Sequence, residues 1–157
     1  ILDRPDETFV LGYEQALGYL VAPRPLDKDG VSAAVLLAEV AAAAAADGTT
    51  LQAQLDEIAE RYGRHAIAEK SVQMDPAAAA AAVGALQGSP PAELGGAAVE
   101  DVVSFPEANL LRFELAGGVR VQVRPSDTEP KVKFYGEAVG ADPAPYLEAL
   151  AEALQSG

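Results

Sequence analysis

The side chains best suited to chemistry lie together near the C-terminal end, in the sequence VRVQVRPSDTEPKVKFY at residues 119–135. Its charged residues are the cations Arg120, Arg124, Lys131 and Lys133 and the carboxylates Asp127 and Glu129. A phosphate dianion is bound best where a guanidinium fork, hydroxyl donors and backbone N–H groups converge. Arg124, followed by the hydroxyls of Ser126 and Thr128 in a turn between two prolines, offers that set. The stretch therefore predicts an anion site; the alternative is a solvated polar hairpin whose lysines protect a sheet edge.

Two strands must position these donors. Side chains alternate between the two faces of a strand. The valines of residues 119–123 therefore share a core face, and Arg120, Gln122 and Arg124 share the opposite face. In the same way, the two lysines of residues 131–133 face away from the core. The pattern places the cations of both strands on one exposed face.

The composition removes several classes of protein. The chain has 157 residues, enough for one ordinary domain or two small ones, and 11 Lys and Arg against 24 Asp and Glu give it a net charge of −13. Such a chain is expected to repel nucleic acid and anionic membranes. The absence of cysteine excludes disulfides, Cys-ligated zinc and thiol catalysis, and a single histidine, His65, makes a multi-His metal site hard to build. No targeting segment or membrane span is recognised, so the cytoplasm is the expected compartment.

The pattern indicates two parts that meet at Gly63. In residues 1–62 the expected elements are a short buried strand at 7–11, a loop at 12–19, a turn at 27–30, a helix at 31–46 and a helix from Thr49 or Thr50 to Tyr62. In residues 63–157 they are a strand at 66–72, a helix at 76–88 capped by Asp75, strands at 98–105, 110–115, 119–124 and 131–138, and a helix at 143–154. The fold class is therefore α/β and α+β: a partial α/β domain, then an open, mostly antiparallel sheet with helices on one face.

Three motifs resemble those of the alpha-D-phosphohexomutases, the phosphoglucomutase/phosphomannomutase superfamily. RPSDTEPK at residues 124–131 resembles the family signature RPSGTEPK, GYEQALGY at 12–19 resembles its sugar-binding loop, and DKDG at 27–30 resembles its DKDG turn. The motifs stand in the family's order, and the resemblance covers essentially the whole chain. It corresponds only to the C-terminal part of the family: the end of the third, sugar-binding domain at 1–62 and the fourth, phosphate-binding domain at 63–157.

The resemblance implies a mutase that interconverts hexose 1-phosphate and hexose 6-phosphate through a phosphoserine and a 1,6-bisphosphate. Its partner is the hexose phosphate; glucose 1,6-bisphosphate would be the intermediate or activator, and Mg²⁺ would be bound outside this chain. The family's TASHNP serine loop and DGDxDR metal loop do not occur in the sequence. The chain is therefore expected to be a piece of the mutase that holds no catalytic residue and is inactive alone.

The same resemblance implies two groups of binding residues. Those for the sugar are Glu14, Ala16 and Lys28, and those for the phosphate are Arg124, Ser126, Asp127, Thr128 and Lys133. Two residues depart from the family pattern: Gln15 replaces a second glutamate, and Asp127 replaces a glycine. A carboxylate repels phosphate, so the Asp127 side chain is expected to point away from the ligand.

Two alternatives stay open. The chain could be a self-contained, non-catalytic module that binds sugar phosphates, or a nucleic-acid-binding module on an open sheet, against which the net charge of −13 counts. Glu14 and Lys28 could be solvated loop residues, and His65 is expected to be a surface or linker residue. The sequence leaves open glucose, mannose or pentose phosphate as substrate, and it leaves the oligomeric state open.

Overall fold

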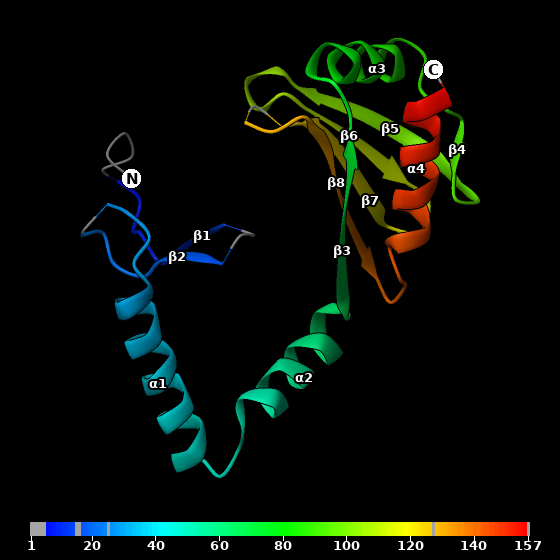
Figure 1. The fold of residues 1–157 in the computed structure, drawn as a ribbon. Helices are drawn as coiled ribbons and strands as arrows, with labels where there is room; N and C mark the ends of the chain where they lie inside the picture. Colours follow the sequence, from blue (N-terminus) through cyan, green and yellow to red (C-terminus); the bar gives the residue numbers. More distant parts are fainter. Residues whose placement is uncertain (1–5, 15–16, 25, 127, 157) are drawn as a thin grey trace. The chain divides into compact units, whose positions relative to one another are not determined.

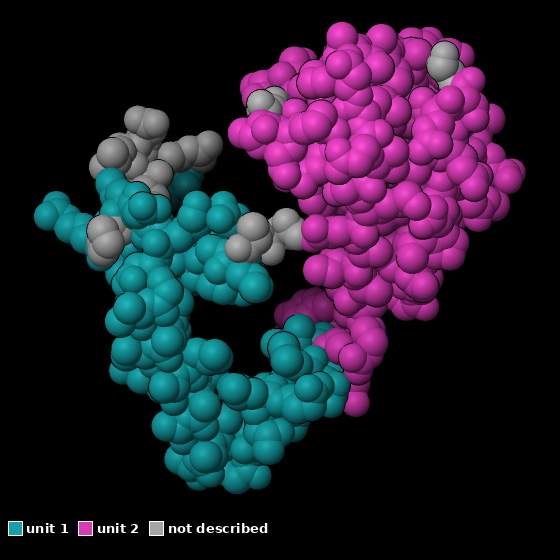
Figure 2. All heavy atoms as spheres, in the orientation of Figure 1, with its two compact units in different colours: residues 1–58 teal, residues 59–157 magenta. Residues whose placement is uncertain are grey.

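The computed structural model describes residues 6–14, 17–24, 26–126 and 128–156. It divides into two compact units, Ile1–Ile58 and Ala59–Gly157, which Figure 2 colours separately. This division falls inside the second helix of the chain, whereas the domain boundary predicted from the sequence follows the end of that helix. The domain boundary after residue 62 stays a prediction.

The first unit consists of a hairpin and helices. Its elements are β1 (Gly12–Glu14), β2 (Gly18–Leu20), α1 (Gly30–Ala46) and most of α2 (Leu51–Tyr62). The two strands are antiparallel, with Tyr13 opposite Tyr19. Asp29 caps α1, since its carboxylate accepts hydrogen bonds from the backbone N–H groups of Val31 at 3.1 Å and Ser32 at 3.0 Å. Both predicted helices are confirmed.

The strand predicted at residues 7–11 is wrong. Those residues have no strand partner in the described part of the chain, and the first ladder begins at Gly12, opposite Leu20. A run of apolar residues forms a strand only where another strand supplies hydrogen-bond partners, and here the hairpin pairs the residues that follow. Val10 is therefore 83% exposed instead of buried.

The first unit has almost no interior of its own. Among its described residues Ala44 alone is buried. Large apolar side chains that face outward include Leu11, Leu17, Val35, Leu37, Leu55 and Ile58. The helices of this unit therefore gain little stabilisation from burial of apolar surface.

The second unit is an antiparallel sheet covered by helices. Its strands are β3 (His65–Gln73), β4 (Glu93–Leu94), β5 (Ala97–Phe105), β6 (Leu110–Leu115), β7 (Val119–Pro125) and β8 (Lys131–Val139). Among the described residues these six strands form one sheet in the order β3-β8-β7-β6-β5-β4. The helices are α3 (Pro76–Gly88) and α4 (Ala144–Ser156), with a short 3₁₀ turn, η1 (Pro106–Ala108), between β5 and β6. Both α-helices lie on one face of the sheet (Figure 1), as the sequence predicts.

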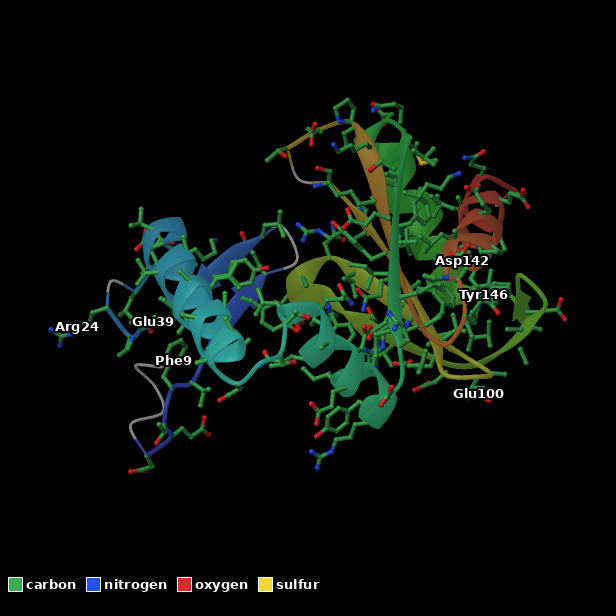
Figure 3. The ribbon with its side chains drawn as sticks, turned by 90° about the horizontal axis from the view of Figure 1, so that it is seen from below. Phe9, Arg24, Glu39, Glu100, Asp142 and Tyr146 are labelled. Carbon is green, nitrogen blue, oxygen red and sulfur yellow. The ribbon has the colours of Figure 1, made fainter. Side chains whose placement is uncertain are left out.

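The core of this unit lies between the sheet and its two helices. Alternate residues of β6, β7 and β8 are buried there, among them Phe113, Val121 and Phe134, none of which is exposed. Burial of each such side chain stabilises the fold by roughly 1.5–3 kcal/mol. Asp142, labelled in Figure 3, begins α4 by accepting a hydrogen bond from the N–H of Ala144 at 3.0 Å. The well-packed sheet therefore fixes the two strand ends from which the β7–β8 connection extends.

Three short strands were not predicted: β1 and β2 fall on the loop expected at residues 12–19, and β4 falls on the loop expected before residue 98. β4 has two residues, too few for alternation to show, and lies where a loop is expected.

In the part of the chain that the structure describes, no helix is long and apolar enough by itself to cross a bilayer. α1 and α2 meet that test only as a pair, and they are bent by 88° at their break.

Candidate functional site

The β7–β8 connection closes into a tight loop. The N–H of Ser126 donates to the carbonyl of Lys131 at 2.9 Å, and the N–H of Lys131 donates to the carbonyl of Glu129 at 2.7 Å. The loop is tied to the start of α3 as well, since the N–H of Met74 donates to the carbonyl of Pro130 at 3.0 Å. The prediction counted on free N–H groups in this turn, but that of Ser126 is used within the loop.

The register of the two strands sets Arg124 beside Lys133. The two residues are direct partners in the β7–β8 ladder, and their half-buried side chains lie on the face opposite the helices. Two cations of adjacent strands therefore stand side by side where the strands enter the loop. The alternation predicted from the sequence is confirmed here.

The other two cations of the basic stretch are held by carboxylates. Lys131 Nζ lies 2.7 Å from Glu129 Oε2, and this ion pair lowers the pKa of Glu129 below its ordinary range. Arg120 Nε lies 3.4 Å from Glu114 Oε1, and its Nη1 lies 3.5 Å from Glu137 Oε2. Neighbouring carboxylates therefore partly neutralise the charges of Lys131 and Arg120.

The ion pairs continue along the same face of the sheet, away from the loop. Arg112 Nε lies 2.8 Å from Glu114 Oε1, and His65 Nδ1 lies 2.8 Å from Glu137 Oε1. His65 is thus a residue of β3 that contacts β8, consistent with a surface role. Arginine–carboxylate pairs link β8, β7 and β6, and His65 of β3 contacts Glu137, an arrangement that suits a structural network and not an anion site.

The hydroxyls of the loop line a hollow that other segments complete. The hollow has a volume of about 420 Å³, and the loop contributes Ser126, Thr128, Glu129 and its prolines. Pro76 and Ala80 of α3 form another wall, and Asn109 of the β5–β6 connection a third. Figure 1 shows both connections at the same end of the sheet, beside the start of α3. Among the described residues of the lining none is a cation, so Arg124 and Lys133 lie on the strands outside the hollow.

The hairpin of the first unit brings Glu14 and Lys28 together. Lys28 Nζ lies 3.1 Å from Glu14 Oε2, and each side chain is about half exposed. The N–H of Asp29 donates to the carbonyl of Tyr19 at 3.0 Å, which ties the turn that carries Lys28 to β2. The two residues predicted to bind sugar therefore form one polar cluster.

Gly18 allows this approach. It stands opposite Glu14 in the β1–β2 ladder. A Cβ at this position would lie 2.3 Å from Lys28 Cδ and 2.7 Å from Glu14 Oε1. The ion pair occupies the space that a Cβ would fill, so a larger residue at this position would force the Glu14 and Lys28 side chains to move.

Three residues singled out from the sequence lie outside the described residues: Gln15, Ala16 and Asp127. Their predicted roles stay predictions. Sequence reasoning also missed two residues that shape the sites. Gly18 was recognised only as part of a glycine-bracketed loop. Asn109 was treated only as part of the link between two strands, although an asparagine that follows a proline-led turn is a common signal for a left-handed residue.

The described residues do not fit a magnesium site. Across residues 6–14, 17–24, 26–126 and 128–156, no group of three or more His, Cys, Asp or Glu side chains is arranged to hold a metal ion. Glu129 and Glu14, the carboxylates nearest the two clusters, are each paired with a lysine. No chemistry of these residues is therefore derived through a metal.

Comparison with known proteins gives the same family for both units. Residues 66–153 match the family model described as "Phosphoglucomutase/phosphomannomutase, C-terminal domain". Residues 2–62 match the one described as "Phosphoglucomutase/phosphomannomutase, alpha/beta/alpha domain III".

Individual relatives agree. A probable phosphomannomutase of Haemophilus influenzae is 36% identical over 149 residues, which cover 91% of this chain and 31% of the relative. A phosphopentomutase of Mus musculus is 32% identical over 83% of this chain and 25% of its own length. A phosphoglucomutase of Staphylococcus epidermidis is 26% identical over 83% of this chain and 28% of its own length. The chain thus spans about a quarter to a third of the relatives it matches.

Proposed function

Because this chain belongs to the phosphoglucomutase/phosphomannomutase family, we propose that it is the C-terminal part of a hexose-phosphate mutase and supplies sugar- and phosphate-binding loops. The observation that carries the proposal is the pairing of Arg124 with Lys133 at the mouth of the hydroxyl-bearing β7–β8 loop. A hexose phosphate is the ligand for which such a loop, combined with a carboxylate cluster such as that of Glu14, is suited.

The β7–β8 loop would hold the phosphate that is not being transferred. A guanidinium can donate two parallel hydrogen bonds to a phosphate, and the ammonium of Lys133 adds a second charge against the dianion. The hydroxyls of Ser126 and Thr128 would complete the set from the side of the hollow. These contacts stay constant while the reacting phosphoryl group moves, so their role is to bind and orient.

Glu14 would orient the sugar ring. Its Oε2 is held by Lys28, and a carboxylate with one oxygen so engaged can accept from ring hydroxyls with the other. Hydroxyls lie on both sides of a hexose, so such a contact does not select which phosphate is presented for transfer. This suits a reaction in which the bound sugar is used in two orientations.

The transfer itself would involve residues that this sequence does not contain. In the proposed reaction the P–O bond of a phosphoserine breaks as a hydroxyl oxygen of the sugar monophosphate forms a new P–O bond. The attacking hydroxyl loses its proton, and the departing serine oxygen takes up a proton. The resulting 1,6-bisphosphate reorients in the site and returns its other phosphoryl group to the serine. We propose that the present chain alone has no mutase activity. Magnesium would be held by other parts of the protein.

The test is calorimetric titration of the chain with glucose 6-phosphate, mannose 6-phosphate, ribose 5-phosphate, inorganic phosphate and glucose. Arg124→Ala is the test variant, and Arg120→Ala is its control, because it removes the same charge from the same face of the same strand. Arg124→Ala is expected to lower affinity for the sugar phosphates by on the order of tenfold or more, and Arg120→Ala by less than about twofold.

The remaining outcomes separate the alternatives. Tight, sugar-selective binding by the chain alone would favour the self-contained binding module. Equal losses in the two variants would reject a specific phosphate contact by Arg124. The absence of saturable binding to any phosphate compound would reject the proposed function of the loop.

A further inference from the structure

The β5–β6 connection brings one more polar side chain to the phosphate loop. We propose that Asn109 is a phosphate-binding residue, whose carboxamide donates a third side-chain hydrogen bond to the phosphate held by Ser126 and Thr128. The assignment rests on the proposed function of that loop. It adds a residue from a separate segment, fifteen or more positions earlier in the chain, to a site otherwise formed by β7, β8 and their connection.

The first argument is position. Asn109 lines the same hollow as Ser126 and Thr128, together with Pro76 and Ala80 of α3. Of the described residues in this lining, Asn109 is the one amide, and Ser126 and Thr128 are the two hydroxyls. A phosphate bound by Ser126 and Thr128 would therefore lie beside the hollow that Asn109 also lines.

The second argument is the chemistry of the wall. Prolines and an alanine line much of the hollow and have no side-chain donors, and the carboxylate of Glu129 can only accept. The amide group of Asn109 is thus the remaining neutral donor for an anion there.

The third argument separates this role from a purely conformational one. Asn109 has a left-handed backbone, with φ 49° and ψ 41°, and its N–H donates to the carbonyl of Pro106 at 3.1 Å. Glycine and aspartate also tolerate this conformation. If Asn109 had a purely conformational role, Gly or Asp at this position would serve equally well. If its carboxamide contacts phosphate, neither Gly nor Asp can replace it.

The experiment compares these variants by calorimetric titration of the full chain with inorganic phosphate and glucose 6-phosphate. Asn109→Gly keeps the backbone and removes the donor, so affinity should fall by on the order of tenfold, the usual cost of losing a hydrogen bond to a charged group. Asn109→Asp should weaken binding further, because it sets a like charge against the phosphate. Ala108→Asp is the control, since it adds the same charge one residue away at a side chain outside the lining. It should change affinity by less than about threefold.

A second readout uses the composition of the chain. Asn109 is the only asparagine in the sequence, so its side-chain NH₂ signals in a ¹⁵N spectrum are identified by their loss in Asn109→Gly. They should shift on addition of phosphate with the same midpoint as the calorimetric binding. If the unmodified chain binds but both Asn109 variants bind equally well and the NH₂ signals stay still, the assignment to Asn109 is wrong and the function of the loop stands. If the unmodified chain does not bind phosphate, both fail together.

Discussion

At the residue scale, the acidic background of the chain extends to the proposed phosphate loop. Glu129 lines the same hollow as the two hydroxyls, and Lys131 holds its charge in place by lowering its pKa. Because the folded pKa is depressed, the stabilisation from this pair is present above the unfolded pKa of glutamate and is lost as the pH falls through the lower folded value. Near neutral pH, Glu129 therefore opposes a bound anion.

Removal of this charge should strengthen phosphate binding. Glu129→Gln is expected to raise affinity for inorganic phosphate by roughly threefold at low salt, and less at high salt, as screening of an exposed charge requires. Glu100→Gln, at an exposed carboxylate of β5 that lies outside the hollow (Figure 3), is the matched control and should change little. Titrations at two salt concentrations measure both effects; a loss of affinity in Glu129→Gln would show that the carboxylate supports the site.

The steric requirement at Gly18 leads to a second prediction. Gly18→Ala should push apart the Glu14 and Lys28 side chains, since both are flexible ends and the backbone of the hairpin can stay in place. The affinity for glucose 6-phosphate relative to inorganic phosphate should fall severalfold, because only the sugar contact is lost. Gly12→Ala is the control in the same hairpin, as its Cβ would make an ordinary 3.5 Å contact with Leu20. Equal ratios in the two variants would contradict the role given to the cluster.

At the element scale, α1 depends on its cap. Hydrogen bonds from Ser32 and from the N–H of Val31 lower the pKa of Asp29, so the cap is complete above about pH 4 and is lost as the pH falls through the folded pKa. Asp29→Ala should make amide exchange at Val31 and Ser32 roughly fivefold faster, and Asp29→Ser should largely restore protection. Hydrogen exchange read by NMR at pH 6 measures this. Asp47→Ala, at the far end of the helix, should leave those two amides unchanged.

The elements also show how far sequence reasoning reaches. Helices and long strands of this chain follow from local signals, such as the cap at Asp75 or the alternation of residues 119–123, and these were predicted correctly. The prediction of a strand at residues 7–11 was wrong because a strand needs a pairing partner, and the local sequence pattern does not show which segment supplies one. The phosphate hollow was out of reach for a similar reason: α3, the β5–β6 connection and the β7–β8 loop meet only once the sheet has its strand order.

At the scale of the whole chain, the two units should differ in stability. The second unit has a continuous core around Phe113 and Phe134, whereas among described residues of the first unit Ala44 alone is buried. Amides of residues 98–138 should therefore exchange by global opening and those of residues 1–62 by much easier local opening. Mass-spectrometric hydrogen exchange should show at least a hundredfold difference in median rate, on the order expected for a few kcal/mol. Better protection of the first unit would overturn this.

The hydrogen bond from Met74 to Pro130 makes Met74 a natural NMR probe of the β7–β8 loop. Met74 is the single methionine of the sequence, and its N–H is held by the carbonyl at one end of the β7–β8 connection. Its methyl group gives one resonance in a ¹³C-methionine-labelled sample of this chain. The side chain lies between β3 and α3 and packs against the core of the second unit. Ligand occupancy of the loop should therefore be readable in this chain from one peak, with no engineered label.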